Sequence, residues 1–579
     1  MRPTPLIVLL LSLFLTLQAQ QPTAVPKDLL GRDFVVAARV ERVSRDWWMG
    51  RKHICPGVRM YDPQLVRFSV SGDSLIISII DEKFKPEPCV LPIAAAHDDS
   101  LLVDLSPFFL RVQRGLDILS GKSLPGELRE SQIERMRGDI RHLEVSVSHT
   151  YDPPQSAGDG TQEAAAPYEL SVRKSLLLLP DPPMQCRQAD PRISYKDNEH
   201  PYINRFRVED STRIVFHIDD RFPPLWQDAI RQGIEDWNLA FATIGHPSLL
   251  KAVTFSESGA GFDPFDITSN TFFRVESQQA NAEGRHWIDP RTGEILQADV
   301  LFYSNVLSKL KSWLFLQTAA YYPEVRSAIS DSLVSRLIRY AAAHEIGHCL
   351  GLEHNFRASH AYRTEDLRDP AFCKAFGTTA SIMDYARFNY VAQPGDGVTC
   401  VFPPILGPYD IYAIQAGYTD FPDDAAYRSF IDRHQADPCC LYRKASRGAL
   451  PIDPEVQASD LGDDALASTR YGIANLQYIV AHIRQWHDPS PSQPSLDAPR
   501  SASAPDPADP FEGKPATRLD LQRYYFDLLG HLLPLRHDPA VRSYLDLQLS
   551  LGYLFLKHPA TDAELEKQRA DFIAHLNHK

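Results

Sequence analysis

The residues best suited to chemistry lie in one short segment, 341–354, with the sequence AAAHEIGHCLGLEH. His344 and His348 are four residues apart, so on a helix both imidazoles leave the same face and can reach one metal ion. Gly351 stands where that helix must end, because glycine takes the left-handed conformation that turns the chain. The turn can bring His354 back as a third ligand. Three neutral histidines leave one position open for water, which is the arrangement of a catalytic zinc site.

Glu345 follows the first of these histidines and is not itself a ligand. A carboxylate at this place can accept a proton from the activated water and return it to a leaving amine. Three histidines and a glutamate are costly to bury on a helix without an ion, which argues against a purely structural role. Zinc is the metal that this ligand set favours, although Mn, Co or Ni could occupy three imidazoles. The segment therefore predicts one catalytic zinc ion with Glu345 as general base.

The helix that carries these residues is predicted by an apolar stripe that begins near Ser332. The stripe has helical spacing and small residues just before the site; its members are Leu333, Leu337, Ile338, Ala341 and Ala342. Upstream, strand patterns at 212–218, 271–275 and 294–302 accompany a helical pattern over 226–242. We therefore expect a domain over 186–420 that forms an α/β layer, in which one long helix carries the metal-binding residues.

The flanking regions differ from this domain. Residues 28–180 contain short β-rich runs separated by turn residues and predict an antiparallel β domain; these runs are 34–40, 65–70, 74–79 and 142–148. Residues 421–579 predict a helical C-terminal region; its helical patterns are 463–486, 518–534 and 540–556. A Pro/Ser-rich segment, 488–516, interrupts that region as a linker. The predicted class is α+β.

Composition and the N-terminal segment indicate the class of protein and where in or outside the cell it is located. The chain has 579 residues, 44% hydrophobic and 23% charged, which excludes wholesale disorder. A net charge of −14 argues against a nucleic-acid partner. Residues 1–19 combine a basic start, a short apolar run and a small-residue exit, and predict a signal peptide. The run is too short to span a bilayer. We expect an exported protein, periplasmic or extracellular, without stable membrane insertion.

The chain has eight cysteines, an even number that permits disulfides in an exported protein. Cys55–Cys89 and Cys373–Cys400 are the pairs suggested by position, because each pair flanks one local segment. Buried thiols are the alternative. A capping role for Cys55 over the metal is disfavoured by its sequence context, and a structural disulfide is the better expectation for this cysteine.

The string HEIGHCLGLEH, residues 344–354, matches the metzincin signature HExxHxxGxxH, and SIMDY, residues 381–385, resembles the metzincin methionine turn. The resemblance implies that Met383 forms a hydrophobic floor beneath the metal. It also implies that Tyr385 approaches the metal or donates to the developing oxyanion; the alternative for Tyr385 is an ordinary core aromatic. Asp384 is a candidate for orienting a ligand histidine.

The similarity extends along the chain to one group of bacterial secreted zinc metalloproteases in which a β-rich domain precedes the metzincin domain. The strings that carry it are 29–40, 190–197, 289–307, 343–356, 381–385 and 407–418. It implies an endopeptidase acting on proteins or peptides, with strand 294–302 as the upper edge of the cleft, where a peptide could add as a further strand. Asn355 stands where astacins have glutamate, so their substrate preferences are not transferred.

Two alternatives remain at this stage. One is a secreted binding or scaffold protein on an inactive protease-like fold, and the other is a zinc hydrolase of a non-peptide amide. Glu345 argues against the scaffold, because a protein that only binds zinc has no chemical need for a base at that position.

Overall fold

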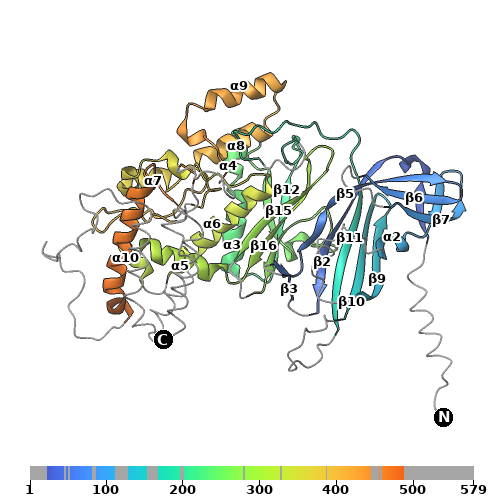
Figure 1. Cartoon of the computed structure of the whole chain (residues 1–579), viewed down its shortest axis with the longest axis horizontal. Helices are drawn as coiled ribbons and strands as arrows, with labels where there is room; N and C mark the ends of the chain where they lie inside the picture. The colour runs from blue at the N-terminus through green and yellow to red at the C-terminus, as the bar shows by residue number, and fades with distance from the viewer. Residues whose placement is uncertain are drawn as a thin grey trace, which may run out of the picture.

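The computed structural model describes residues 22–44, 47–49, 52–80, 87–110, 128–152, 167–195, 201–277, 281–326, 329–385, 388–444, 455–456 and 460–487. The predicted signal peptide, the Pro/Ser-rich segment 488–516 and the expected helices 518–534 and 540–556 lie outside these residues. Figure 1 shows a strand-rich N-terminal half beside a mixed half, in which helices lie on the side of a second sheet that faces away from the first half. The predicted α+β class is confirmed.

The N-terminal half is one antiparallel sheet of nine strands in the order β1-β8-β7-β6-β5-β2-β11-β10-β9. Its strands are β1 (Thr23–Pro26), β2 (Asp33–Val43), β5 (Arg59–Ser71), β6 (Ser74–Ile79), β7 (Cys89–Ala96), β8 (Ser100–Val103), β9 (Leu128–Asp139), β10 (His142–Tyr151) and β11 (Tyr168–Leu178). A short hairpin, β3 (Trp47–Met49) with β4 (Lys52–Ile54), and helix α2 (Ser106–Leu110) complete it. The expected antiparallel β domain is confirmed, and its first strand begins before residue 28.

The second sheet has five strands in the order β13-β12-β14-β16-β15. Its strands are β12 (Ile214–Ile218), β13 (Leu250–Thr254), β14 (Asn270–Val275), β15 (Ala282–Ile288) and β16 (Ile295–Tyr303). The pairs among β13, β12, β14 and β16 are parallel, and β15 is antiparallel to β16. The prediction that strand 294–302 is the edge is therefore wrong, because the hairpin returns the chain and places β15 outside β16.

Helices α3 (Pro224–Glu235) and α6 (Asp331–Cys349) pack on one face of this sheet. The other helices described in this half are α4 (Asn238–Ala242), α5 (Val306–Thr318), α7 (Pro370–Phe376), α8 (Pro408–Tyr418), α9 (Asp424–His434) and α10 (Ala465–His487). The single helix expected over 226–242 is two helices that meet at Trp237. Helix α3 packs closely on α6, since a Cβ added at Gly233 would lie 2.7 Å from the carbonyl oxygen of Arg339.

The β domain covers the opposite face of the same sheet. Successive residues of a strand point to opposite faces, and the two core clusters divide accordingly. In β14, Phe272 packs with the helices, whereas Phe273 packs with residues of the β domain. In β16, Val300 belongs to the helical side and Leu301 to the β-domain side. Both faces of the five-stranded sheet are thus buried, and the two halves form one continuous body.

The suggested cysteine pairs are not disulfides. Cys55 and Cys89 lie in two separate hydrophobic clusters of the β domain, so that pairing is wrong. Cys373 and Cys400 share one small cluster but are not bonded to each other. The two cysteines of each suggested pair flank one segment of the chain, but that position does not give them the Cβ geometry that a disulfide requires. Within the described residues, no helix combines the length and the apolar character that crossing a membrane needs.

Candidate metal centre

Helix α6 carries the first two histidines near its C-terminal end. The helix begins where the Ser330 hydroxyl accepts a hydrogen bond from the Leu333 N–H at 3.3 Å, which satisfies one of the orphan donors of the first turn. Its apolar stripe is buried, with Leu337 and Ile338 fully inaccessible. Burial of that stripe fixes the rotation of the helix, so the same geometry decides where His344 and His348 point.

The three predicted ligands converge on one point. The Nε2 atom of His354 lies 3.2 Å from Nε2 of His344 and 3.1 Å from Nε2 of His348. The Nδ1 atom of His344 is 2.7 Å from the carbonyl oxygen of Ile382, and that of His348 is 2.8 Å from the carbonyl oxygen of Leu352. A carbonyl oxygen only accepts, so both Nδ1 atoms carry hydrogen and both Nε2 atoms of the neutral rings present lone pairs.

This donor set fits a zinc ion. Two nitrogen ligands at the usual zinc–nitrogen distance and a tetrahedral angle are about 3.3–3.4 Å apart, close to the separations of His354 from the other two rings. Lone pairs aimed at one another this closely are unfavourable unless a cation lies between them. His344 is buried, and His348 and His354 are partly exposed, so one side of the centre is open to solvent and substrate.

Gly351 makes the turn that places His354. Its φ is +98°, a conformation that residues with a side chain rarely adopt. An added Cβ would also lie 2.1 Å from the carbonyl oxygen of Asn204, in the segment that precedes the catalytic sheet. The glycine is thus required twice, by its backbone angle and by the close approach of a second chain segment.

Glu345 lies on the face of α6 that meets the edge strand β15. The residue is 8% exposed, and Oε2 of its carboxylate accepts a hydrogen bond from the Gly284 N–H at 2.6 Å. Burial raises the pKa of Glu345 to about 8, and the Gly284 hydrogen bond acts in the opposite direction. An added Cβ at Gly284 would lie 2.1 Å from the Glu345 carbonyl oxygen. Only glycine lets the strand approach the helix this closely.

Met383 packs against helix α6 at Gly347, and Tyr385 lies beside two of the histidines. Met383 is fully buried, and its sulfur would be 2.2 Å from a Cβ added at Gly347 of α6, so glycine at 347 makes room for the methionine. The Tyr385 ring is 4.3 Å from the ring of His354, centroid to centroid, in an edge-on arrangement. Phe356 stacks on His354 from another side at 5.3 Å. The Phe356 and Tyr385 rings also contact each other at 5.3 Å, so the third histidine belongs to a cluster of three rings.

The methionine turn is held by a buried carboxylate of α8. Asp410 accepts hydrogen bonds from the Ser381 hydroxyl at 2.6 Å, the Ile382 N–H at 2.8 Å and the Gly407 N–H at 2.6 Å. The Ile382 carbonyl in turn accepts from His344. Asp410 therefore orients a ligand through one peptide unit, as an outer-shell partner does. Burial raises its pKa to about 6.

Sequence reasoning missed Gly284 and Asp410, and it misplaced Asp384. The Asp384 carboxylate accepts from the Ser359 N–H at 2.7 Å, and main-chain carbonyls orient His344 and His348 instead. The proposal that Asp384 orients a ligand histidine is thus wrong. The position of Asp410 three residues after Gly407, at the start of an apolar helix, is a capping signal that could have been recognised. No local signal marks Gly284, since its role depends on the approach of α6.

Comparison with known protein families assigns the two halves separately. Residues 60–210 match the model of a domain of unknown function, DUF5117. Residues 326–503 match a model described as Met-zincin. No curated protein and no solved structure matches the chain. The Met-zincin match contains α6, the three converging histidines and the methionine turn, and a zinc site is what this arrangement implies. Residues 326–503 are therefore similar to the Met-zincin family, which supports a zinc metallopeptidase, and the chain joins this region to an N-terminal β domain.

Proposed function

We propose that this protein is a zinc-dependent endopeptidase. The observation that carries the proposal is the convergence of three Nε2 atoms beside a buried carboxylate that is not a ligand. His344, His348 and His354 would hold the ion. When bound there, zinc acts as a Lewis acid toward the scissile carbonyl and makes its water a stronger acid.

The chain's own residues divide the remaining work. Glu345 accepts the proton of the attacking water and returns it to the leaving amine. The Gly284 N–H holds one oxygen of that carboxylate, so the general base has a fixed position before substrate arrives. Tyr385 is placed beside His354 and would donate its hydroxyl hydrogen to the oxyanion that develops on the former carbonyl oxygen.

The edge strand β15 is the proposed docking element for substrate. It is the outermost strand on the side of the sheet next to α6, and an extended peptide can pair with such an edge through main-chain hydrogen bonds. This assignment replaces 294–302 as the substrate-binding strand. The predicted leader at 1–19 supports export, so we place the enzyme in the periplasm or outside the cell, where proteins and peptides are its substrates.

The test is a comparison of wild type with Glu345→Gln, measuring zinc content and cleavage of casein and a peptide library. Glutamine keeps the shape and the hydrogen bond from Gly284 but cannot take a proton. We expect one zinc per chain in both proteins and cleavage by wild type only. Wild-type rates in the variant would remove Glu345 from the mechanism. Zinc in both with cleavage in neither would favour the scaffold protein, or the non-peptide amide hydrolase if a wider substrate screen gives turnover.

A further inference from the structure

Two buried arginines of the β domain reach the back of the catalytic sheet. Arg39 of β2 and Arg59 of β5 are 0% and 6% exposed. Nη1 of Arg39 lies 3.1 Å and 3.3 Å from the two carboxylate oxygens of Asp299, in β16. Nη2 of Arg59 lies 3.6 Å from Asp299 and 3.1 Å from Oε1 of Gln297, in the same strand. Both guanidinium groups therefore bind one strand of the sheet that carries the site.

The edge strand takes part in the same cluster. The ring of Trp287, in β15, is 5.2 Å from the guanidinium carbon of Arg39 and 4.8 Å from that of Arg59. Asp299 supplies one negative charge for two buried cations, and an aromatic face stabilises the excess positive charge. Buried ion pairs of this kind are weak evidence for stability, and in some proteins they fix the register of packed elements instead. Here the cluster joins β15 and β16 to the β domain.

The front of the same two strands is held by α6. The thiol of Cys349 lies 3.6 Å from the carbonyl oxygen of Asp299 and 3.8 Å from that of Arg285. Gly284 donates its N–H to Glu345. The hairpin β15–β16 is therefore clamped between two layers, with arginines of the β domain behind it and the general-base helix in front. A displacement of the hairpin would move both the β15 edge, where substrate is proposed to pair, and the Gly284 N–H that binds Glu345.

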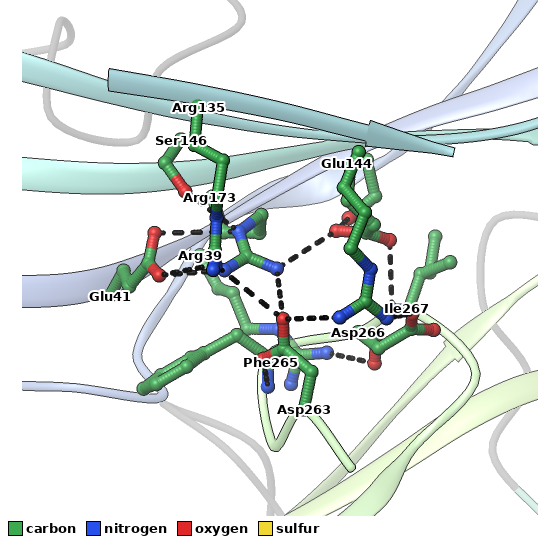
Figure 2. Close-up of polar contacts among 12 residues, drawn as sticks. Arg39, Glu41, Arg135, Glu144, Ser146, Arg173, Asp263, Phe265, Asp266 and Ile267 are labelled. Atoms are coloured by element: carbon green, nitrogen blue, oxygen red, sulfur yellow. Dashed lines mark hydrogen bonds and ion pairs between the residues drawn. The ribbon is translucent and has the colours of Figure 1, made fainter. Parts of the chain in front are cut away.

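A second contact of the β domain anchors the loop that leads into β14, and it adjoins the arginine clamp because Nη2 of Arg39 donates to the Asp266 carbonyl oxygen at 2.7 Å. Figure 2 shows Arg173 of β11 directed toward Glu41 and Asp263, and Glu144 close to Ile267. The Arg173 guanidinium lies 2.6 Å from the Glu41 carboxylate and 2.8 Å from that of Asp263. The Ile267 N–H donates to Glu144 at 3.1 Å. This network can hold the two halves together when the arginine clamp is altered, so the clamp can be tested in a folded protein.

We propose that the β domain is a permanent positioning element of the enzyme, and that Arg39 and Arg59 are positioning residues that fix the substrate-binding hairpin β15–β16 against Glu345. The proposal rests on the proposed function for its catalytic consequence. It assigns the β domain a role opposite to that of an inhibitory segment, since its loss would free the hairpin instead of uncovering the site.

The test uses Arg59→Met in the full-length protein. Methionine keeps much of the side-chain length but removes the charge, and it leaves Asp299 with Arg39 as a one-to-one pair, so the variant should fold. Arg42→Met is the matched control, because Arg42 lies in β2 of the same domain and pairs with Glu134 and Glu169 at the surface. Residue-resolved amide hydrogen exchange over 282–288 is the first readout, since it needs no activity.

We expect exchange in 282–288 to be at least about tenfold faster in Arg59→Met than in wild type or Arg42→Met, with exchange in β10 and β11 unchanged. Unchanged exchange in 282–288, or equal acceleration throughout the protein, would overturn the proposal. The second readout is kinetics with an extended peptide at full zinc loading. We expect kcat/KM to fall by up to about 10²-fold, and wild-type kinetics despite faster exchange would also overturn it. If wild type cleaves nothing, the protease assignment fails and the exchange result still decides whether the arginines fix the hairpin.

Discussion

The ligand histidines are aimed by main-chain carbonyls and not by carboxylates. His344 donates to Ile382 and His348 donates to Leu352, so their orientation depends on the paths of the methionine turn and of the turn after α6. Substitution of a neighbouring side chain can leave these bonds intact. A change in backbone angle cannot, which makes Gly351 the most sensitive single position near the site.

Gly351→Ala should destabilise the protein more than Gly245→Ala. Both glycines have positive φ, +98° and +92°, and an added methyl group meets nothing within 4 Å at Gly245 but lies 2.1 Å from the Asn204 carbonyl at Gly351. We expect the control to cost about 1–2 kcal/mol of unfolding free energy and Gly351→Ala about 1–3 kcal/mol more. Thermal unfolding and zinc affinity of the two variants measure this. Equal losses in both would show that Asn204 moves aside without cost.

Individual site residues could be predicted from the sequence where residues of a reactive type also have a diagnostic spacing. The three histidines could be identified because a helix, a glycine and a fixed spacing leave few other arrangements. Gly284 could not, since a glycine within a short strand has many explanations and its N–H acquires meaning only when α6, some sixty residues later, packs against it. The tyrosine was assigned by resemblance, and its ring does lie against His354.

At the scale of single elements, one histidine of the β domain connects its strand to the catalytic half. His142 of β10 lies 3.3 Å from Glu144 and 3.2 Å from Asp266 of the catalytic half. Their carboxylates also accept from the main chain at Ile267 and Thr268 and from Arg137, so protonated imidazole, not a metal, is the cation that suits this place. Hydrogen bonds to Asp266 and then to Glu144 raise the pKa of His142 from 6.5 to about 10.

This shift predicts how stability depends on pH. A histidine whose folded pKa is raised contributes stability that is fully present below the unfolded value of about 6.5 and is lost as pH rises toward the folded value of about 10. We expect wild type to exceed His142→Gln in melting temperature by most at pH 6, with the difference shrinking between pH 7 and 10. Because the two melting temperatures are compared at the same pH, the titration of other groups affects both proteins equally and cancels. A gap that stays constant with pH would mean that His142 acts only through shape.

Elements with clear periodicity were predictable and those without it were not. The apolar stripe of α6 predicted a helix, and the alternation of apolar and polar residues in β10 and β16 predicted strands. Strand β15, with the sequence AEGRHWI, has charged residues and a glycine in place of alternation, because one of its faces meets buried arginines and the other meets the active-site helix. Its absence from the prediction is why the wrong strand was placed at the edge.

The whole molecule should behave as one cooperative unit. A hydrophobic cluster is shared across the boundary, with Val58 on one side and Leu301 on the other, and the Arg39–Asp299 pair is buried between them. Salt screens exposed ion pairs strongly but buried contacts much less. The interface should therefore persist when the connection between the halves is cut.

A protease recognition sequence inserted after Pro183, in the exposed stretch 181–183, tests this expectation. After cleavage we expect the two fragments to elute together in gel filtration at both low salt and 1 M NaCl, with a single thermal transition as in the uncut protein. Separate elution at either salt concentration would show that the covalent connection, and not the shared core, keeps the halves together.

The interface itself was beyond prediction from the sequence. Arg39, Arg59 and Arg173 lie in strands, where charged residues ordinarily face solvent. Their burial became evident only when the partner sheet, with Asp299 and Asp263, was in place. The α+β class and the antiparallel β domain could be anticipated, but not that the β domain covers the back of the catalytic sheet.

The distance along the chain between Arg39 and Asp299 also sets an order of events during synthesis. These residues are 260 positions apart, so the nine strands of the N-terminal sheet leave the ribosome well before the strand that will pair with them. The last strand of that sheet, β11, ends at Leu178, 121 positions before Asp299, so at roughly 5–20 residues per second the interval is about 6–24 seconds. During that time the surface that will receive β16 is complete but uncovered, with cationic and apolar groups awaiting a partner. The β domain is therefore synthesised before the strand that covers it, and the metal centre follows both, because its third histidine is residue 354 of 579.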